Sequence, residues 1–382
     1  MRTGLKINEK GHLVIAGNDC TDLRQKYGTP LYVMDMDYVE EMCNAYVSSM
    51  KEYYGRGRVV FASKAFCCKA MAALAVKCGM GLDVVSGGEL YTALQAGADP
   101  SQLIFHGNNK LDRELEAIVE NRVGLTVLDS ADEAADLDAI CARKGVKADC
   151  LIRINPGVDA HTHSYIQTAR PDSKFGFGVF NGEAMKMAER VLSLKHINLK
   201  GFHSHIGSQI FEINAFVKAV GIITDFMKEI KDKFGFETEI LNLGGGFGIV
   251  YTDEDKPKTP SEYLKALTDA LKKNIAEKSL VEPFLIIEPG RSVVGEGGIT
   301  LYTAGRIKEI PELRNYIAVD GGMFDNPRFA LYQAKYACDL ANRMNDKKDY
   351  TATIAGKCCE SGDLIIVDAL LPKPEKGDLI AV

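Results

Sequence analysis

The sequence predicts an α/β protein in which a (β/α)8 barrel of the TIM type is joined to a mainly β domain. Two observations lead to this prediction. Short runs rich in β-branched and aromatic residues alternate with stretches of helical period over most of the chain, and such alternation indicates a parallel sheet. After Arg291 the β-like runs continue, but few helical stretches separate them. We therefore expect a barrel first and a β domain after it.

The predicted barrel strands share a β-rich core and an end marked by glycine, polar or charged residues. They are Arg58–Ser63, Gly81–Ser86, Leu103–Gly107, Gly124–Asp129, Cys150–Asn155, Gly201–His205, Glu239–Leu243 and Phe284–Glu288. The helices predicted between them include Gly88–Ala96, Ala131–Lys144, Ala215–Lys233 and Ser261–Lys278. Eight strand–helix units are the number that closes into a barrel.

We assign residues 36–290 to the barrel, and residues 1–35 and 291–382 to the β domain. The run Thr29–Val33 is strand-like and precedes the first barrel strand, so we expect it to pair with the later β runs. The last residues, Leu379–Val382, look like a strand interrupted midway. We therefore expect the β domain to be truncated at its C-terminus.

Composition excludes several classes of protein. The chain has 382 residues, of which 46% are hydrophobic, and a formal net charge of −6, so no nucleic acid or anionic membrane is expected as a partner. No apolar run approaches the roughly 20 residues that span a bilayer, and no signal peptide is recognisable, so we expect a cytoplasmic protein. The ten cysteines form no Cys-x-x-Cys pair, and no metal site is expected.

An ordered set of residues suggests a pyridoxal phosphate site. This cofactor needs an amine for its aldehyde, a flat group against its ring, backbone N–H groups around its phosphate and a carboxylate at its ring nitrogen. Lys64, His205, the glycine run Gly244–Gly248 and Glu288 offer these groups. They fall at the predicted C-terminal ends of barrel strands or just after them, where barrel enzymes have their active sites.

Each of these residues also has a simpler interpretation. A lone lysine at a strand end is usually a solvated cation, and Glu288 could be a buried partner of Arg291. His203 and His205 could suggest a metal site, but a metal needs further ligands. The glycine run does not match a dinucleotide fingerprint, because Ile249 stands where the last glycine is required. The set as a whole favours the cofactor.

Several motifs, taken in order, show a resemblance that runs almost from end to end. They are Phe-Ala-Ser-Lys-Ala at 61–65, Leu-Asp-Val-Val-Ser-Gly-Gly-Glu-Leu at 82–90, Phe-His-Gly-Asn-Asn-Lys at 105–110, Ser-Lys-Phe-Gly at 173–176, His-Ser-His-Ile-Gly-Ser at 203–208, Glu-Pro-Gly-Arg at 288–291 and Cys-Glu-Ser-Gly-Asp at 359–363. With these motifs the chain resembles the diaminopimelate decarboxylases, in the alanine-racemase-like class (fold type III) of pyridoxal phosphate enzymes. The resemblance implies the same barrel and β domain.

The resemblance also implies residue roles at the cofactor. Lys64 would hold the aldehyde, His205 would lie against the ring and Glu288 would face the ring nitrogen. The full set of expected cofactor-binding residues is Lys64, Asp83, His205, Ser208, Gly244, Gly245, Gly246, Glu288, Gly290 and Arg291. The backbone of Gly246, Gly290 and Arg291 is expected at the phosphate.

For the substrate, the resemblance implies that Arg291, Arg328 and Tyr332 bind a carboxylate and that Glu360 receives an ammonium group. Cys359 would protonate the substrate carbon after carbon dioxide leaves, because a thiol with a pKa of about 8.5 is mostly protonated near neutral pH. In this family Cys359 and Glu360 come from the other subunit, so a homodimer with shared active sites is expected.

The expected reaction is decarboxylation of meso-2,6-diaminopimelate to L-lysine and carbon dioxide, the last step of lysine biosynthesis. The alternative is a decarboxylase of ornithine, lysine or a carboxylated polyamine such as carboxynorspermidine, whose site would not need two arginines. A racemase, or a regulatory protein on a disabled scaffold, is disfavoured by the Cys-Glu-Ser-Gly-Asp motif and by retained Lys64 and Glu288. Relatives also continue with a Gly-Ala-Tyr motif that nothing here matches.

Overall fold

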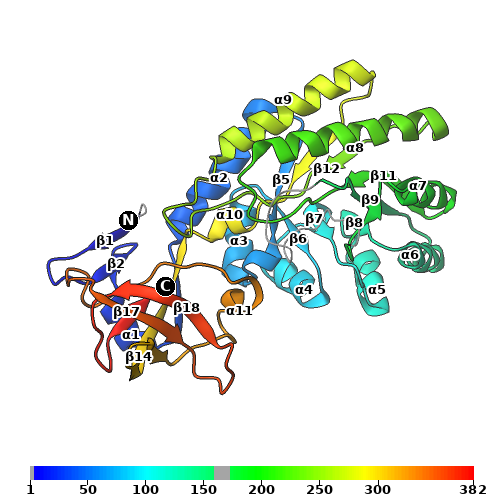
Figure 1. The fold of residues 1–382 in the computed structure, drawn as a ribbon. Coiled ribbons are helices and arrows are strands. Elements are labelled where there is room, and N and C mark those ends of the chain that lie inside the picture. Colours follow the sequence, from blue (N-terminus) through cyan, green and yellow to red (C-terminus); the bar gives the residue numbers. More distant parts are fainter. Residues whose placement is uncertain (1–3, 159–172) are drawn as a thin grey trace. The chain divides into compact units, whose positions relative to one another are not determined.

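The computed structural model describes residues 4–158 and 173–382, and its chain divides into two compact units (Figure 1). Unit 1 comprises Met1–Val39, Ile249–Lys256 and Gly295–Val382, and unit 2 comprises Glu40–Gly248 and Pro257–Val294. Residues 1–3 of the predicted N-terminal segment lie outside the described residues. Segment 249–256 follows the glycine run in sequence but groups with the β-rich unit.

Unit 2 is a barrel of eight parallel strands. Its strands are β5 (Gly57–Ala62), β6 (Gly81–Val84), β7 (Leu103–Phe105), β8 (Leu125–Leu128), β9 (Ala148–Asn155), β11 (Ile197–His203), β12 (Ile240–Asn242) and β13 (Phe284–Ile287). Each pairs with the next in this order, and β13 pairs with β5, which closes the ring. The short β10 (Phe177–Gly178) pairs only with β9. The predicted (β/α)8 barrel is confirmed.

Helices lie between the barrel strands. They are α2 (Met36–Tyr53), α3 (Lys69–Lys77), α4 (Gly87–Gln95), α5 (Asp112–Glu120), α6 (Ala131–Lys144), α7 (Glu183–Ser193), α8 (Ile213–Phe234), α9 (Pro260–Lys278) and α10 (Arg291–Val294), with 3-10 turns η1 (Ser63–Ala65) and η2 (Pro100–Gln102). Local chemistry fixes their ends. The Ser130 hydroxyl accepts from the Glu133 N–H at the start of α6, and Gly145 ends this helix in the left-handed conformation.

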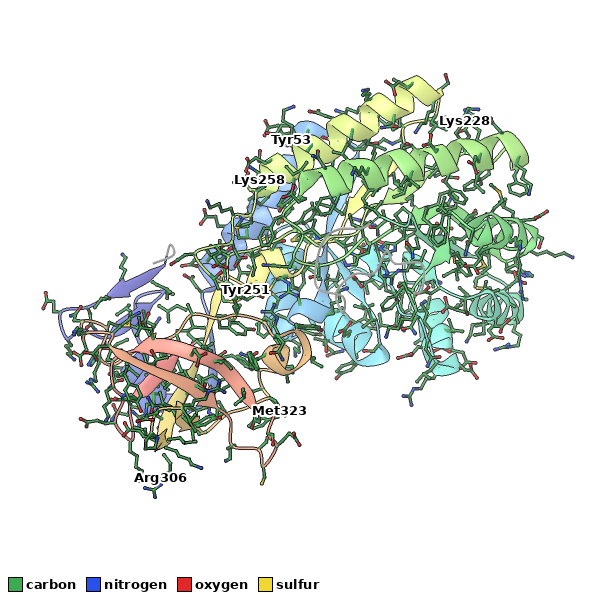
Figure 2. The ribbon with its side chains drawn as sticks, viewed as in Figure 1. Tyr53, Lys228, Tyr251, Lys258, Arg306 and Met323 are labelled. Carbon is green, nitrogen blue, oxygen red and sulfur yellow. The ribbon has the colours of Figure 1, made fainter. Side chains whose placement is uncertain are left out.

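Apolar residues predominate in the barrel strands, and most of these residues are buried, as a sheet covered by helices requires. A buried cluster inside unit 2 joins side chains from different strands, including Val60, Ile104, Val127, Leu151 and Ile286. The outer faces of the helices are polar. Lys228, for example, extends from α8 (Figure 2), where it pairs with Asp232 one turn later.

Unit 1 is mainly β. Its elements are β1 (Leu5–Ile7), β2 (Leu13–Ile15), β3 (Asn18–Asp19), α1 (Cys20–Tyr27), β4 (Leu31–Met34), β14 (Gly298–Ile310), β15 (Arg314–Val319), α11 (Arg328–Tyr332), β16 (Asp339–Leu340), β17 (Tyr350–Ala355), β18 (Leu364–Leu371) and β19 (Leu379–Ala381). Strands β16, β19, β14, β15, β17 and β18 follow one another across a sheet, and β4 also pairs with β14.

The pairing of β4 with β14 confirms that the N-terminal run joins the C-terminal β domain. It is antiparallel, with Met34 opposite Gly298 and Leu31 opposite Leu301. Leu301 is fully buried, in a cluster that also holds Leu379 of β19. The apolar ends of the chain are therefore held by one shared core.

Among the described residues, no helix combines the length and the apolar character that crossing a membrane demands.

Candidate active site

Ionisable side chains that could take part in catalysis lie together at the C-terminal ends of the barrel strands. Lys64 lies in η1 directly after β5, Asp83 lies in β6, and Glu288 follows β13. With His205, two residues beyond β11, they line one cavity of about 320 Å³. The lining residues all belong to unit 2. Four of the predicted site residues are thus brought together by parallel strands that end at one edge.

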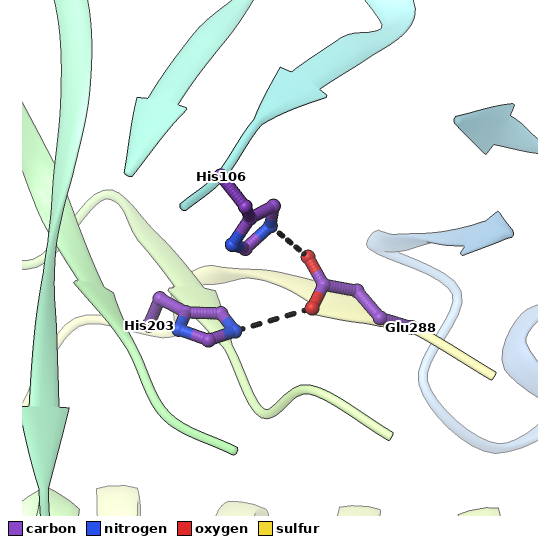
Figure 3. A group of neighbouring side chains, drawn as sticks. All are labelled: His106, His203 and Glu288. Carbon is purple, nitrogen blue, oxygen red and sulfur yellow. Dashed lines mark hydrogen bonds and ion pairs between the residues drawn. The ribbon is translucent and has the colours of Figure 1, made fainter. Parts of the chain in front are cut away.

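Glu288 is the centre of a buried hydrogen-bond network (Figure 3). The residue is only 6% exposed. Oε1 lies 2.7 Å from His106 Nε2 and accepts from Asn242 Nδ2 at 2.6 Å, while Oε2 lies 3.1 Å from His203 Nε2. An ionised carboxylate can only accept, so both imidazoles donate through Nε2. A carboxylate offers about four acceptor sites, and these three donors leave room for one more.

The network fixes the charge of its members. Burial alone would raise the pKa of Glu288, but His106 and His203 outweigh it and hold that pKa well below its usual range. Burial lowers the pKa of His203 to about 3, although Glu288 opposes this effect. Burial also opposes protonation of His106, but Asp83 and Glu288 prevail and raise its pKa. Glu288 is therefore held as an anion beside one neutral histidine, His203.

Asp83 adds a second carboxyl group to the same cavity. Its Oδ1 lies 3.9 Å from His106 Nε2 and has no hydrogen-bond partner among the described residues. Burial raises the pKa of Asp83 to about 6, against the lowering effect of His106. A buried polar atom without a partner is unusual in a folded protein, and it indicates a place for a polar ligand.

We expect Asp83→Asn to change how stability depends on pH. Above pH 6 the Asp83 carboxyl group of the wild type is ionised in both the folded and the unfolded state. Folding then carries the free-energy cost of removing this charge from water. Between pH 6 and about 4 the folded protein holds a proton on Asp83 that the unfolded chain releases. The contribution of Asp83 to the free energy of unfolding therefore rises as the pH falls. Any stability advantage of the variant over the wild type is therefore largest at pH 8 and shrinks toward pH 4.5.

The expected change between these two pH values is on the order of 1 to 3 kcal/mol. Denaturant unfolding of both cofactor-free proteins at pH 8 and pH 4.5 measures it. An offset between the two proteins that stays the same at both pH values contradicts the assigned burial of the charge.

The glycine run brings backbone close to the strand ends. Gly245 packs so tightly that an added Cβ would lie 2.0 Å from the Glu288 carbonyl oxygen. Gly246 has φ +103° and would meet the Gly207 carbonyl oxygen at 2.2 Å. Only glycine fits at these positions. The run therefore has no room for side chains directly after β12, and its role at a phosphate stays a prediction from the sequence.

His205 is fixed to this run. Its Nδ1 accepts from the Gly245 N–H at 3.2 Å, so a neutral ring carries its proton on Nε2. Burial, with the charge of Lys64, holds the pKa of His205 well below its usual range. The cavity is therefore lined by a flat, uncharged ring.

Ser208, Gly290 and Arg291 lie near the same strand ends in unit 2. Arg291 opens α10 and donates to Ser208 Oγ from Nε at 3.3 Å and from a terminal nitrogen at 3.2 Å. Gly290 approaches the first strand so closely that an added Cβ would lie 3.0 Å from Ala62 Cβ. These contacts join the segment after β13 to the loop after β11 and to the end of β5.

The predicted substrate-binding residues Arg328, Tyr332 and Glu360 belong to unit 1, as does the predicted proton donor Cys359. Arg328 and Tyr332 are the first and last residues of α11. Cys359 and Glu360 lie in the loop between β17 and β18, and both are exposed.

Buried Asp363 organises this unit 1 region. One carboxylate oxygen accepts from the Met323 N–H at 2.6 Å and the other accepts from the Cys358 N–H at 2.7 Å. The carboxylate therefore ties the segment before α11 to the loop that carries Cys359.

The cavity fits the cofactor that the sequence predicts. An amine (Lys64), a neutral ring (His205) and a held anion (Glu288) with one acceptor site to spare surround a space of about 320 Å³. A carboxylate in this state suits a protonated ring nitrogen. Asp83 Oδ1, which has no hydrogen-bond partner among the described residues, offers a further polar contact to a ligand.

The sequence interpretation gave no cofactor-site role to four residues that the structure places there. His106, His203 and Asn242 bond to Glu288, and Arg153 lines the cavity while its guanidinium lies 4.3 Å above the Phe175 ring. All four fall on or just after barrel strands. Their position at strand ends was a usable signal, but Glu288, the shared partner of His106, His203 and Asn242, is 46 to 182 residues away along the chain.

Comparison with known proteins gives consistent results. Residues 39–295 match the family model described as pyridoxal-dependent decarboxylase, pyridoxal binding domain. The diaminopimelate decarboxylase of Bacillus methanolicus is 49% identical over 377 residues, which cover 99% of this chain and 87% of that protein. The diaminopimelate decarboxylase of Bacillus subtilis is 49% identical over 375 residues, 98% of this chain and 85% of that protein.

Solved structures agree with the sequence relatives. The diaminopimelate decarboxylase of M. jannaschii in complex with L-lysine matches with a TM-score of 0.89 and 34% identity, over 99% of this chain and 87% of that one. This likeness extends over both units of the chain.

Proposed function

The chain belongs to the diaminopimelate decarboxylase family of pyridoxal-dependent enzymes, and on this premise we propose how its residues act. The protein decarboxylates meso-2,6-diaminopimelate to L-lysine and carbon dioxide, the last step of lysine biosynthesis. Its cofactor is pyridoxal phosphate. The observation that best supports this function is the cavity where Lys64, His205 and the anionic Glu288 meet.

Pyridoxal phosphate, when bound, supplies an electron sink for the carbon–carbon bond that breaks. Lys64 would hold the cofactor through its amine. Glu288, kept anionic by His106 and His203, would keep the ring nitrogen protonated, and His205 would cover one ring face. The backbone of Gly246, Gly290 and Arg291 would bind the phosphate, with Gly244, Gly245 and Ser208 beside it. Buried Asp83 would contact the cofactor from β6.

Substrate binding requires groups from unit 1. Arg328 and Tyr332, with Arg291, would bind the carboxylate at the substrate end that does not react, and Glu360 would accept its ammonium group. Cys359 would deliver a proton to the carbon that loses carbon dioxide.

We further propose a homodimer in which Cys359 and Glu360 of one protomer complete the site of the other. Their exposure in unit 1 is compatible with this role. The cytoplasmic location stays a prediction from the sequence.

The test is carbon dioxide release by the cofactor-loaded protein from meso-diaminopimelate, L-lysine and L-ornithine, each at equal concentration. Release from meso-diaminopimelate alone supports the proposal. Release from L-ornithine or L-lysine instead would assign the chain to decarboxylases of basic amino acids that have only an amine at the far end.

A further inference from the structure

The guanidinium of Arg328 lies against two tyrosine rings within unit 1. Its Cζ is 4.2 Å from the centroid of the Tyr251 ring and 5.3 Å from that of Tyr336. The two rings are perpendicular, with centroids 5.5 Å apart. Tyr251, labelled in Figure 2, comes from segment 249–256, far from α11 in sequence. Aromatic faces attract a cation, so the rings restrict where the guanidinium can lie.

A chain of hydrogen bonds fixes the guanidinium further. One terminal nitrogen of Arg328, Nη1, donates to the Tyr336 hydroxyl at 2.9 Å. That hydroxyl donates its single proton to Asn326 Oδ1 at 3.3 Å, which leaves its oxygen to accept from Arg328. Nη1 of the guanidinium is therefore bonded to a neutral group.

The positive charge of Arg328 is not neutralised by these contacts. Among the described residues of unit 1, no carboxylate forms an ion pair with it, and its buried Nε has no hydrogen-bond partner. Arg343 in the same unit shows the usual structural arrangement, with carboxylates of Asp346 at 2.7 Å and Asp378 at 2.9 Å. A buried donor without a partner is unfavourable, so an acceptor at this edge is favoured.

We propose that Tyr251 and Tyr336 are positioning residues that determine substrate specificity, by holding the Nε edge of Arg328 ready for a carboxylate. A guanidinium edge and a carboxylate match in a bidentate pair. The ligand is the carboxylate at the non-reacting end of the substrate, so the inference rests on the proposed function. A substrate with only an amine at that end gains nothing from this arrangement.

The test uses two ligands that differ by one carboxylate, L-lysine and 1,5-diaminopentane, each titrated into cofactor-loaded protein. Tyr251→Leu removes the aromatic face that lies nearer Arg328. We expect it to weaken L-lysine binding about three- to thirtyfold and to leave 1,5-diaminopentane binding within about twofold. The KM for meso-diaminopimelate should rise by a similar factor while kcat changes less. Tyr251→Phe keeps the face and should restore L-lysine binding.

Tyr336→Phe is a milder second variant, since it keeps the ring and removes only the hydroxyl. We expect it to weaken L-lysine about two- to tenfold. The matched control is Tyr350→Leu, in the same unit. The Tyr350 ring lies 5.5 Å from Lys373, but that lysine is already paired with Glu309, so neither ligand should change.

Two results overturn the inference. Equal weakening of both ligands in Tyr251→Leu would show a general structural role, and unchanged L-lysine binding in both Tyr251→Leu and Tyr336→Phe would show no role. The proposed function fails separately, when the wild type releases no carbon dioxide from meso-diaminopimelate.

Discussion

Lys64→Ala is expected to lower kcat for carbon dioxide release from meso-diaminopimelate by about a thousandfold or more, the scale seen when a covalent catalytic group is lost. Lys64 lies at the end of β5 and lines the cavity with His205 and Glu288. Alanine removes the amine that would hold the cofactor, and no local rearrangement of η1 restores it. Steady-state assays with saturating cofactor measure the loss.

The control for this variant is Lys69→Ala. Lys69 is an exposed lysine at the start of α3, five residues further along the chain, and its removal should leave kcat within about twofold, as is usual for a surface change. Turnover by Lys64→Ala within about tenfold of the wild type contradicts the role of this amine.

Glu288→Gln is expected to lower kcat by about a hundred- to a thousandfold, comparable to the loss of one preorganised electrostatic group. Glutamine keeps the shape of the side chain but cannot carry the negative charge that holds a ring nitrogen protonated. Its amide nitrogen also presents N–H groups to His106 or His203, which already donate to this position. Kinetics and cofactor titration of the variant separate loss of turnover from loss of binding.

The same substitution at Glu239 is the control. This carboxylate lies 2.8 Å from the Lys200 ammonium group and does not line the cavity. Glu239→Gln should retain its kcat. If Glu288→Gln binds cofactor normally and turns over at the wild-type rate, the electrostatic role assigned to Glu288 is wrong.

Local sequence signals were sufficient for much of the barrel. Helix Ala131–Lys144 was predicted with its observed ends, since Ser130 caps one end and Gly145 terminates the other. The seventh strand was predicted as Glu239–Leu243 and is Ile240–Asn242. Such one-residue differences arise because a strand ends where its ladder hydrogen bonds end, and that depends on its neighbours.

Contacts between side chains far apart along the chain could not be predicted from the sequence. The histidines of Phe-His-Gly and His-Ser-His are visible as strand-end residues, but only the closed ring of strands brings His106 and His203 to opposite oxygens of Glu288. Residues 253–260 are typical of a charged, proline-containing loop between barrel elements. Segment 249–256 nevertheless groups with unit 1, where Tyr251 lies beside Arg328. Neither pairing has a local sequence signature.

Borohydride reduction of the cofactor-loaded wild type, followed by peptide mass mapping, tests most directly whether the barrel cavity is the reaction centre. We predict that a pyridoxyl phosphate group is found on the peptide containing Lys64 and is absent from that peptide in Lys64→Ala. Stable labelling of a different lysine in the wild type would contradict the assignment of this cavity.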